Sequence, residues 1–126
     1  MSLLKCYELT PQGRQKSFYG KAEVVYDDGE LSLISYTTAV AKTEPIDLYK
    51  RVNLKGWYSR TTARHLDSFL SLLQSEYGFY GLNTAIAKIQ ENEKIKSGKA
   101  FFEKIEWVDV THWTYKVRGD QYSKGI

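Results

Sequence analysis

The first half of the chain shows the alternation of apolar and polar positions that is typical of β-strands. Residues 17–26, SFYGKAEVVY, follow this pattern, with Phe18, Ala22, Val24 and Tyr26 on one face. The sequence Asp27-Asp28-Gly29-Glu30 comes next and predicts a tight turn, because Gly accepts positive φ and Asp hydrogen-bonds within its own turn. Residues 31–42, LSLISYTTAVAK, are rich in β-branched and aromatic side chains and predict the return strand.

A third strand is predicted after Thr43-Glu44-Pro45, over residues 46–54. One face of this segment would carry Ile46, Leu48, Val52 and Leu54, and the other would carry Asp47, Tyr49, Arg51 and Asn53. Such a division is typical of an antiparallel strand with one solvated face. We therefore expect an antiparallel β-meander in the first half of the chain.

The apolar spacing then changes to three and four residues, the period of an amphipathic helix. From Thr62 onward the apolar positions are Leu66, Phe69, Leu70, Leu73 and Tyr77. Ser59, Thr61 or Thr62 can cap the start of this helix, and Gly78 is well placed to end it.

The remainder of the chain predicts a second helix and two extended segments. The helix is expected from Asn83 or Thr84 to about Lys96, and a strand over residues 83–89 is the alternative. Ser97-Gly98 is expected to interrupt the chain, and residues 104–110 and 113–117 are expected to be strands or extended. Residues 119–126 are polar and expected to be frayed.

These elements predict an α+β fold. We expect an N-terminal antiparallel β-meander of about three strands, two central helices and a β or extended C-terminal segment. The length of 126 residues suits one domain spanning residues 1–126.

Composition and charge narrow the class of protein only modestly. The chain is 42% hydrophobic and 14% aromatic, which is enough apolar mass for a folded core, and its net charge is +3. This charge permits nucleic acid or an acidic protein as a partner. The one cysteine, Cys6, excludes an internal disulfide framework and suits a reducing compartment. We expect a cytoplasmic protein that does not associate with a membrane, because no long apolar run is present.

Two short motifs resemble a family of small proteins carried by phages and prophages of Gram-positive bacteria. The first is a Y-x-T-x-V-A strand pattern, and the second, more specific one is Y-S-x-T-T-x-R-H-x-x-x-F-L. They match here at Tyr36, Thr38, Val40 and Ala41, and at Tyr58, Ser59, Thr61, Thr62, Arg64, His65, Phe69 and Leu70. The resemblance implies a small cytosolic protein of a mobile element, and it implies no activity.

The segment around the second motif is the strongest candidate for a binding site. A helix that begins near Thr61 would present free backbone N–H groups and the positive end of its dipole. Arg60 and Arg64, four residues apart, could reach one anion there. The candidate binding residues for an anion, nucleic acid or an acidic partner are Lys50, Arg51, Lys55, Trp57, Tyr58, Ser59, Arg60, Thr61, Thr62, Arg64 and His65. The alternative is structural: hydroxyls cap the helix, Trp57 packs under it and the arginines are solvated.

Two kinds of chemistry fit the sequence poorly. Ser59, His65 and Asp67 are the residue types of a hydrolase triad, but residues two apart on a helix point in different directions. The scarce metal ligands are His65, His112, Cys6 and Asp109, and they show no zinc-site spacing. We therefore expect no catalytic residues, no metal and no cofactor.

An acidic patch is a further possible binding surface, with an ordinary solvated strand face as the alternative. It would consist of Glu103, Glu106 and Asp109 around Trp107.

We expect a non-catalytic phage or mobile-element protein that binds a host or phage macromolecule. The most specific hypothesis is a protein inhibitor of a defence nuclease, of the anti-CRISPR type. The alternative is a nucleic-acid-binding accessory protein that uses the basic segment from Lys50 to Arg64. The sequence does not indicate the oligomeric state.

Overall fold

The computed structural model describes residues 4–9, 18, 20–56 and 59–126, and it consists of one antiparallel sheet with three helices. The strands are β1 (Leu4–Glu8), β2 (Ala22–Asp27), β3 (Glu30–Ser35), β4 (Thr38–Thr43), β5 (Arg51–Leu54), β6 (Ile105–Asp109), β7 (Thr114–Val117) and β8 (Lys124–Gly125). The helices are α1 (Arg60–Glu76), α2 (Leu82–Asn92) and α3 (Gly98–Lys104).

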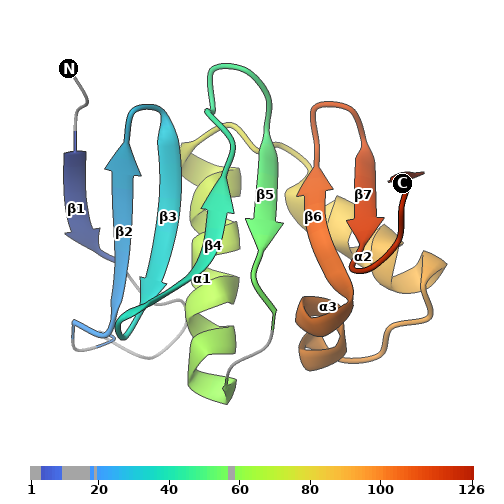
Figure 1. Ribbon diagram of the computed structural model, residues 1–126, viewed down its shortest axis with the longest axis horizontal. Coiled ribbons are helices and arrows are strands. Elements are labelled where there is room, and N and C mark those ends of the chain that lie inside the picture. Colours follow the sequence, from blue (N-terminus) through green and yellow to red (C-terminus); the bar gives the residue numbers. More distant parts are fainter. Residues whose placement is uncertain (1–3, 10–17, 19, 57–58) are drawn as a thin grey trace.

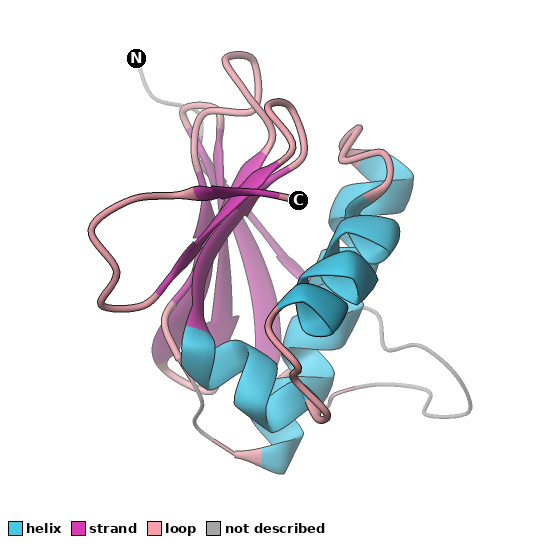
Figure 2. Ribbon diagram, turned by 90° about the vertical axis from the view of Figure 1, so that its right-hand side faces the viewer, coloured by secondary structure: helices cyan, strands magenta, loops and turns pink. Residues whose placement is uncertain are grey.

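The spatial order of the eight strands equals their order in the sequence. Neighbouring strands are antiparallel throughout, and the chain leaves the sheet after Leu54 and returns with Ile105 directly beside β5 (Figure 1). All three helices belong to this single excursion. They lie on one side of the sheet, which leaves the other face without a helical cover (Figure 2).

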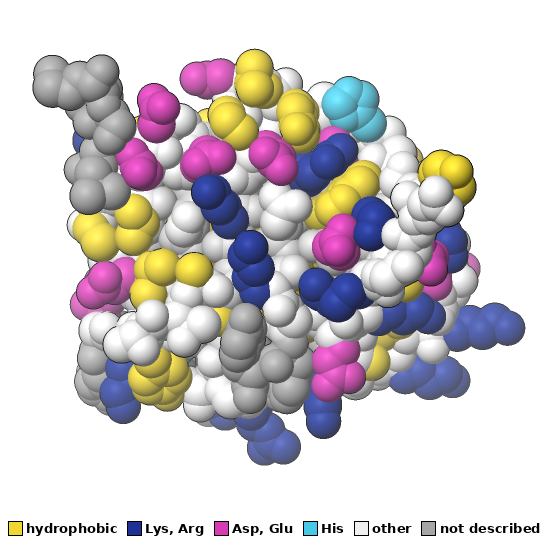
Figure 3. Space-filling model, viewed as in Figure 1, with side chains coloured by type: hydrophobic (Ala, Val, Ile, Leu, Met, Phe, Trp, Pro, Cys, Tyr) yellow, Lys and Arg dark blue, Asp and Glu magenta, His cyan; other side chains and the backbone are white. Residues whose placement is uncertain are grey.

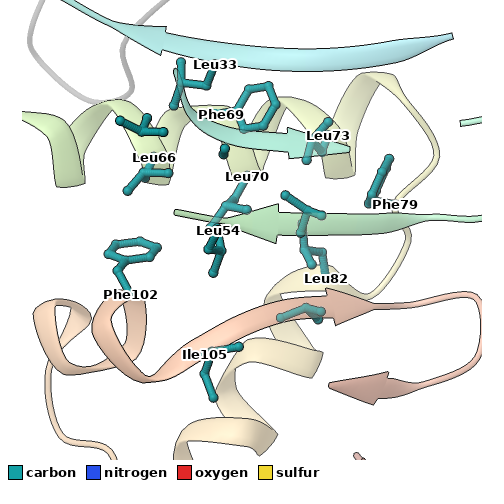
Figure 4. Packing of buried hydrophobic residues seen from close by; sticks show 14 of the residues in the cluster. Leu33, Leu54, Leu66, Phe69, Leu70, Leu73, Phe79, Leu82, Phe102 and Ile105 are labelled. Carbon is teal, nitrogen blue, oxygen red and sulfur yellow. The ribbon is translucent and has the colours of Figure 1, made fainter. Parts of the chain in front are cut away.

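The core lies between the helices and the covered face of the sheet. The apolar stripe of α1 provides its centre, because Leu66, Phe69, Leu70 and Leu73 are all at most 5% exposed. Leu33 and Leu54 approach this stripe from the sheet, and Phe79, Leu82, Phe102 and Ile105 extend the cluster along the second half of the molecule (Figure 4). The predicted core face of α1 is confirmed.

The ends of α1 are also as predicted. Ser59 has extended backbone angles, and its Oγ accepts a hydrogen bond from the N–H of Thr62 at 3.1 Å. At the other end Gly78 has a φ of 78°, and the N–H of Phe79 donates to the carbonyl of Leu73 at 3.1 Å. A left-handed glycine followed by such a long-range bond is a common helix ending.

The predicted three-strand N-terminal meander is wrong, because the sheet has eight strands drawn from both ends of the chain. β1 was not predicted, and the expected return strand over residues 31–42 divides into β3 and β4. The division occurs at Tyr36, whose φ is 59°. Gly and Asn often adopt the left-handed region and so indicate a turn in a sequence, whereas Tyr rarely does. The turn at Tyr36 therefore could not be recognised from the sequence pattern.

The third predicted strand is also too long. β5 comprises only Arg51–Leu54, and residues 46–48 form a turn after Pro45. Leu48, which was expected to share a face with Val52, is 70% exposed. The N–H of Ile46 instead donates to the carbonyl of Gly29 at 2.9 Å, so the turn packs against the β2–β3 hairpin. The tight turn of that hairpin is as predicted, and Asp28 and Gly29 in it both have positive φ.

The second half differs from the prediction at its short elements. α2 is a helix, as preferred over the strand alternative, but it ends at Asn92. The expected break falls at residues 93–97, but Gly98 begins the unpredicted helix α3, which Ser97 caps by accepting from the N–H of Ala100 at 3.1 Å. The expected frayed tail contains β8, which pairs with β7.

Candidate functional site

The N-terminal turn of α1 contains a buried chain of hydroxyl and imidazole groups. The Oγ of Ser35 lies 2.7 Å from Nδ1 of His65 and 3.0 Å from Oγ1 of Thr62. Thr62 Oγ1 in turn accepts from Ser59 Oγ at 3.1 Å. This network joins the start of α1 to the end of β3. The serine and histidine are 2% and 0% exposed, so their hydrogen bond links helix to sheet and is closed to a substrate.

The ring of His65 is enclosed by aromatic side chains. Phe18 meets it edge to face with centroids 4.5 Å apart, and Tyr36 lies at 5.8 Å. Among the described residues, His65 Nε2 is buried without a hydrogen-bond partner. Burial therefore disfavours the charged imidazolium and lowers the pKa of His65 below its ordinary value.

We expect acid to destabilise the protein through His65. An unfolded histidine binds a proton near pH 6.5, and the folded protein resists that proton because its pKa is lower. The contribution is complete above the unfolded pKa, and the free energy of unfolding falls as the pH drops below it. The slope from this group is at most about 1.4 kcal/mol per pH unit. Urea unfolding between pH 7.5 and pH 5.5 measures it.

The control for this prediction is the comparison of His65→Gln with His112→Gln. A glutamine at position 65 does not titrate and can still bond to Ser35, so the variant should lose part of the slope. His112 has a side chain that is 63% exposed, and its substitution should leave most of the slope in place. An unchanged pH dependence in His65→Gln would contradict the assignment.

Arg51, at the start of β5, is held by its neighbours. Its guanidinium lies 3.8 Å from the centre of the Trp107 ring and 5.1 Å from that of Tyr49. The same group forms an ion pair with the carboxylate of Asp109 at 3.4 Å. Its neighbour Lys50 donates from Nζ to the carbonyl of Ile46. Both cations therefore stabilise the start of β5 and the turn that precedes it.

Asp109 also organises the turn between β6 and β7. Its Oδ1 accepts from the N–H groups of Thr111 at 2.8 Å and His112 at 3.0 Å, and Oδ2 lies 2.9 Å from Nδ1 of His112. Burial raises the pKa of the Asp109 carboxyl, but the hydrogen bonds from His112 and the backbone outweigh burial, so the net shift is downward. Asp109 and His112 meet through this turn, which lies between the two segments that were expected to be extended.

The predicted acidic patch around Trp107 does not form as a free surface. Asp109 is fully buried against Arg51, Glu106 pairs with Lys116 at 3.0 Å, and Glu103 lies 4.0 Å from Lys99. In the part of the chain that the structure describes, no group of three His, Cys, Asp or Glu side chains could hold a metal ion.

The predicted binding segment from Lys50 to His65 divides into separate parts. Lys50 and Arg51 lie at the start of β5, whereas Arg60 and Arg64 are exposed on the first turns of α1, beyond the opposite end of that strand. Thr61 is partly exposed, but Thr62 and His65 face the core. Ser59 is committed to capping α1, and Lys55 follows β5. Trp57 and Tyr58 lie outside the described residues.

The charges on the uncovered face of the sheet are more continuous than those of the Lys50–His65 segment, and one end of this face is acidic. Glu8 of β1 lies directly opposite Glu23 of β2, and Asp27 lies directly opposite Glu30 of β3. Like charges in such positions repel each other and reduce the stability of the sheet. Two such pairs on three adjacent strands make β1–β3 the acidic half of this face.

The other half of the uncovered face, over β4–β7, is basic. Lys42 and Lys116 point outward from β4 and β7, and Lys55 and Arg118 follow the ends of β5 and β7. Together with Asn53, Leu54 and Glu106, three of these cations line a hollow of about 280 Å³; they are Lys42, Lys55 and Arg118. Lys and Arg side chains run down the middle of this face and into its lower right, whereas Asp and Glu are concentrated at the upper left (Figure 3).

Arg118 keeps its charge at this hollow while it stabilises the fold. Its guanidinium donates to the carbonyls of Leu54 at 3.0 Å, Glu103 at 3.1 Å and Ile105 at 3.1 Å. Because these acceptors are neutral, they fix the side chain without cancelling its positive charge. Sequence reasoning missed Arg118 and Lys42, since their neighbourhood depends on the pairing of β4, β5, β6 and β7.

These features define an α+β protein with one antiparallel sheet, helices on one face and a divided charge pattern on the other. The chain belongs to the family of unknown function DUF8033, which it matches over residues 7–81, more than half of its length. The match runs from β1 through α1 and ends before α2. No curated protein and no solved structure matches the chain. Across the described residues, no helix has the length and apolar character needed to cross a bilayer.

Proposed function

We propose that this chain is a non-catalytic binding protein that docks a partner protein on the uncovered face of its sheet. The observation that carries the proposal is the division of this face into an acidic half on β1–β3 and a basic half on β4–β7. A partner surface with the reverse arrangement would meet favourable charge over both halves. Complementary charge of this kind directs the orientation of docking and raises the association rate.

The repulsion within the acidic half supports a binding role. Lys42 lies 3.2 Å from Glu30 and bridges the two halves with an ion pair. Asp27 is exposed, and no described residue forms an ion pair with it. A sheet that served only as a scaffold would gain stability if one member of each acidic pair were neutral.

A protein partner fits this face better than nucleic acid does. A nucleic-acid strand that crossed the whole sheet would encounter the carboxylates of β1–β3, which repel phosphate. Single-stranded nucleic acid also needs exposed aromatic rings for base stacking. On the basic half, Trp107 is partly buried and Arg51 already covers one side of its ring.

The buried polar groups support a role without catalysis. The Ser35–His65 hydrogen bond is enclosed in the core, and Asp109 is committed to Arg51 and to the β6–β7 turn. Each group therefore has a structural role that accounts for its position.

The origin in a mobile element, and a host defence nuclease as the partner, are further proposals. They rest on the sequence resemblance around Tyr58–His65 and on the suitability of a small binding protein for inhibition. Nucleic acid as the ligand is the alternative.

Charge reversal tests the proposal. The variants Glu23→Lys/Asp27→Lys and Lys42→Glu/Lys116→Glu invert the two halves of the sheet face. The control is Lys88→Glu/Glu91→Lys, which alters exposed positions of α2 on the helical side. Tagged protein is used to capture partners from a Gram-positive host lysate, with quantification by mass spectrometry. We expect each sheet reversal to reduce a specific protein at least tenfold and the α2 control to retain it.

Two outcomes would contradict the proposal. The first is capture of the same proteins at the same level by all variants. The second is a shift of single-stranded or double-stranded oligonucleotides that weakens steeply with salt and is lost in Lys42→Glu/Lys116→Glu, which would establish the nucleic-acid alternative.

A further inference from the structure

The helical side of the molecule contains a groove that is separate from the uncovered sheet face. It lies between α1, α2 and α3 and has a volume of about 400 Å³. This volume falls within the range of small-molecule sites. Its apolar walls come from all three helices, and they are Leu70, Ile86, Phe101 and Phe102.

Four polar side chains surround these apolar walls. Asp67 and Ser71 are one turn apart on α1, and Asn83 and Gln90 come from α2. Among the residues that the structure describes, none of these four side chains has a hydrogen-bond or ion-pair partner. Ser71 and Gln90 are partly buried, whereas Asp67 and Asn83 are exposed at the mouth of the groove. Polar groups without protein partners gain more from a ligand than groups that are already satisfied.

Asp67 gives the groove its charge. Arg64 lies three residues earlier on α1, yet the two form no ion pair in the described part of the chain. Desolvation by the surrounding helices raises the pKa of Asp67, and no described cation offsets the effect. The carboxylate therefore lacks the counter-ion that its position favours.

We propose that this groove binds a small organic cation, an amine or a guanidine that carries an apolar body. The cationic head would pair with Asp67, and its remaining N–H groups would donate to the amide oxygens of Asn83 and Gln90. The apolar body would lie against Ile86 and Phe102. A metal ion fits less well, because the groove offers one carboxylate and an apolar floor.

A titration followed by amide resonances in ¹⁵N-labelled protein tests this assignment at pH 7.5. The probes are 4-phenylbutylamine, which is cationic, and 4-phenylbutanol, its neutral counterpart. We expect saturable shifts at Asn83, Gln90 and Gly98 with the amine, and at least tenfold weaker binding of the alcohol. Asp67→Asn should reduce amine binding to the level of the alcohol and leave the remaining resonances in place.

A second variant closes the groove without touching its charge. Gly98 lines the groove, and a Cβ added there would meet open space in a backbone conformation that L residues adopt. Gly98→Leu should therefore weaken the amine at least tenfold, whereas Gly125→Leu, at a similarly open position on β8, should not. Equal binding of both probes, shifts away from the groove, or full amine binding in either Asp67→Asn or Gly98→Leu would overturn the proposal.

Discussion

Asp109→Ala is expected to lower the free energy of unfolding by about 3 kcal/mol, because it leaves a half-buried cation without its partner. The carboxylate is fully buried, whereas the Arg51 side chain is 26% exposed and could not be fully rehydrated in place. The Nε–H of Arg51 is already buried without an acceptor among the described residues. The N–H groups of Thr111 and His112 would lose their acceptor as well. Urea unfolding at pH 7.5 measures the loss.

Two further variants separate the ion pair of Asp109 with Arg51 from its hydrogen bonds to the β6–β7 turn. Asp109→Asn keeps an oxygen for the backbone N–H groups and removes the charge, so its loss should be smaller than that of Asp109→Ala. In the double variant Arg51→Met/Asp109→Ala no cation is stranded, so it should be less destabilised than the sum of its two single variants. A loss below about 1 kcal/mol for Asp109→Ala would contradict the importance of this ion pair.

Phe69→Ala is expected to cost about 3–5 kcal/mol, the usual range for the removal of a fully buried aromatic ring. Phe69 is 0% exposed at the centre of the α1 stripe, where it packs between the helix and the sheet (Figure 4). Truncation would leave a cavity that the neighbouring Leu33 and Leu73 can fill only in part. The measurement is thermal and urea unfolding of the purified variant.

The matched control is Ser75→Ala, at an exposed position on the same helix. Alanine has a higher helix propensity than serine, so this variant should be neutral or slightly stabilised. If Phe69→Ala and Ser75→Ala were equally stable, α1 would not be the helix that covers the sheet.

Elements with a long regular pattern could be predicted from the sequence. α1 has five apolar positions at helical spacing, a serine at its start and a glycine at its end, so its local signals agree with its tertiary role. The Asp28-Gly29 turn likewise carries its own chemistry. Both features depend on neighbouring residues alone.

Elements fixed by distant contacts could not be predicted in this way. The turn at Tyr36 has positive φ without a residue that favours it, and the Tyr36 N–H donates to the carbonyl of Lys21, the residue before β2. β6 pairs with β5 across an interval of about fifty residues that contains all three helices. The sequence pattern of either strand gives no information about that partner.

The candidate site illustrates the same limit. The basic run from Lys50 to Arg64 is contiguous in sequence, but its cations lie at opposite ends of β5. The divided surface is instead assembled by strand pairing, which places Glu23 next to Glu8 and brings Lys42 and Arg118 to one hollow. Which charges share a face therefore depends on register and strand order.

Site-specific photo-crosslinking from Ser32 tests the central claim most directly. Ser32 points outward from β3, opposite Lys42, at the boundary between the acidic and basic halves. A benzoylphenylalanine at this position should form a covalent adduct with one host protein in cells, and the adduct should disappear when Lys42→Glu/Lys116→Glu is added. The same group at the exposed Lys88 of α2 should give no such adduct. An adduct from Lys88 but none from Ser32 would contradict docking on the uncovered face of the sheet.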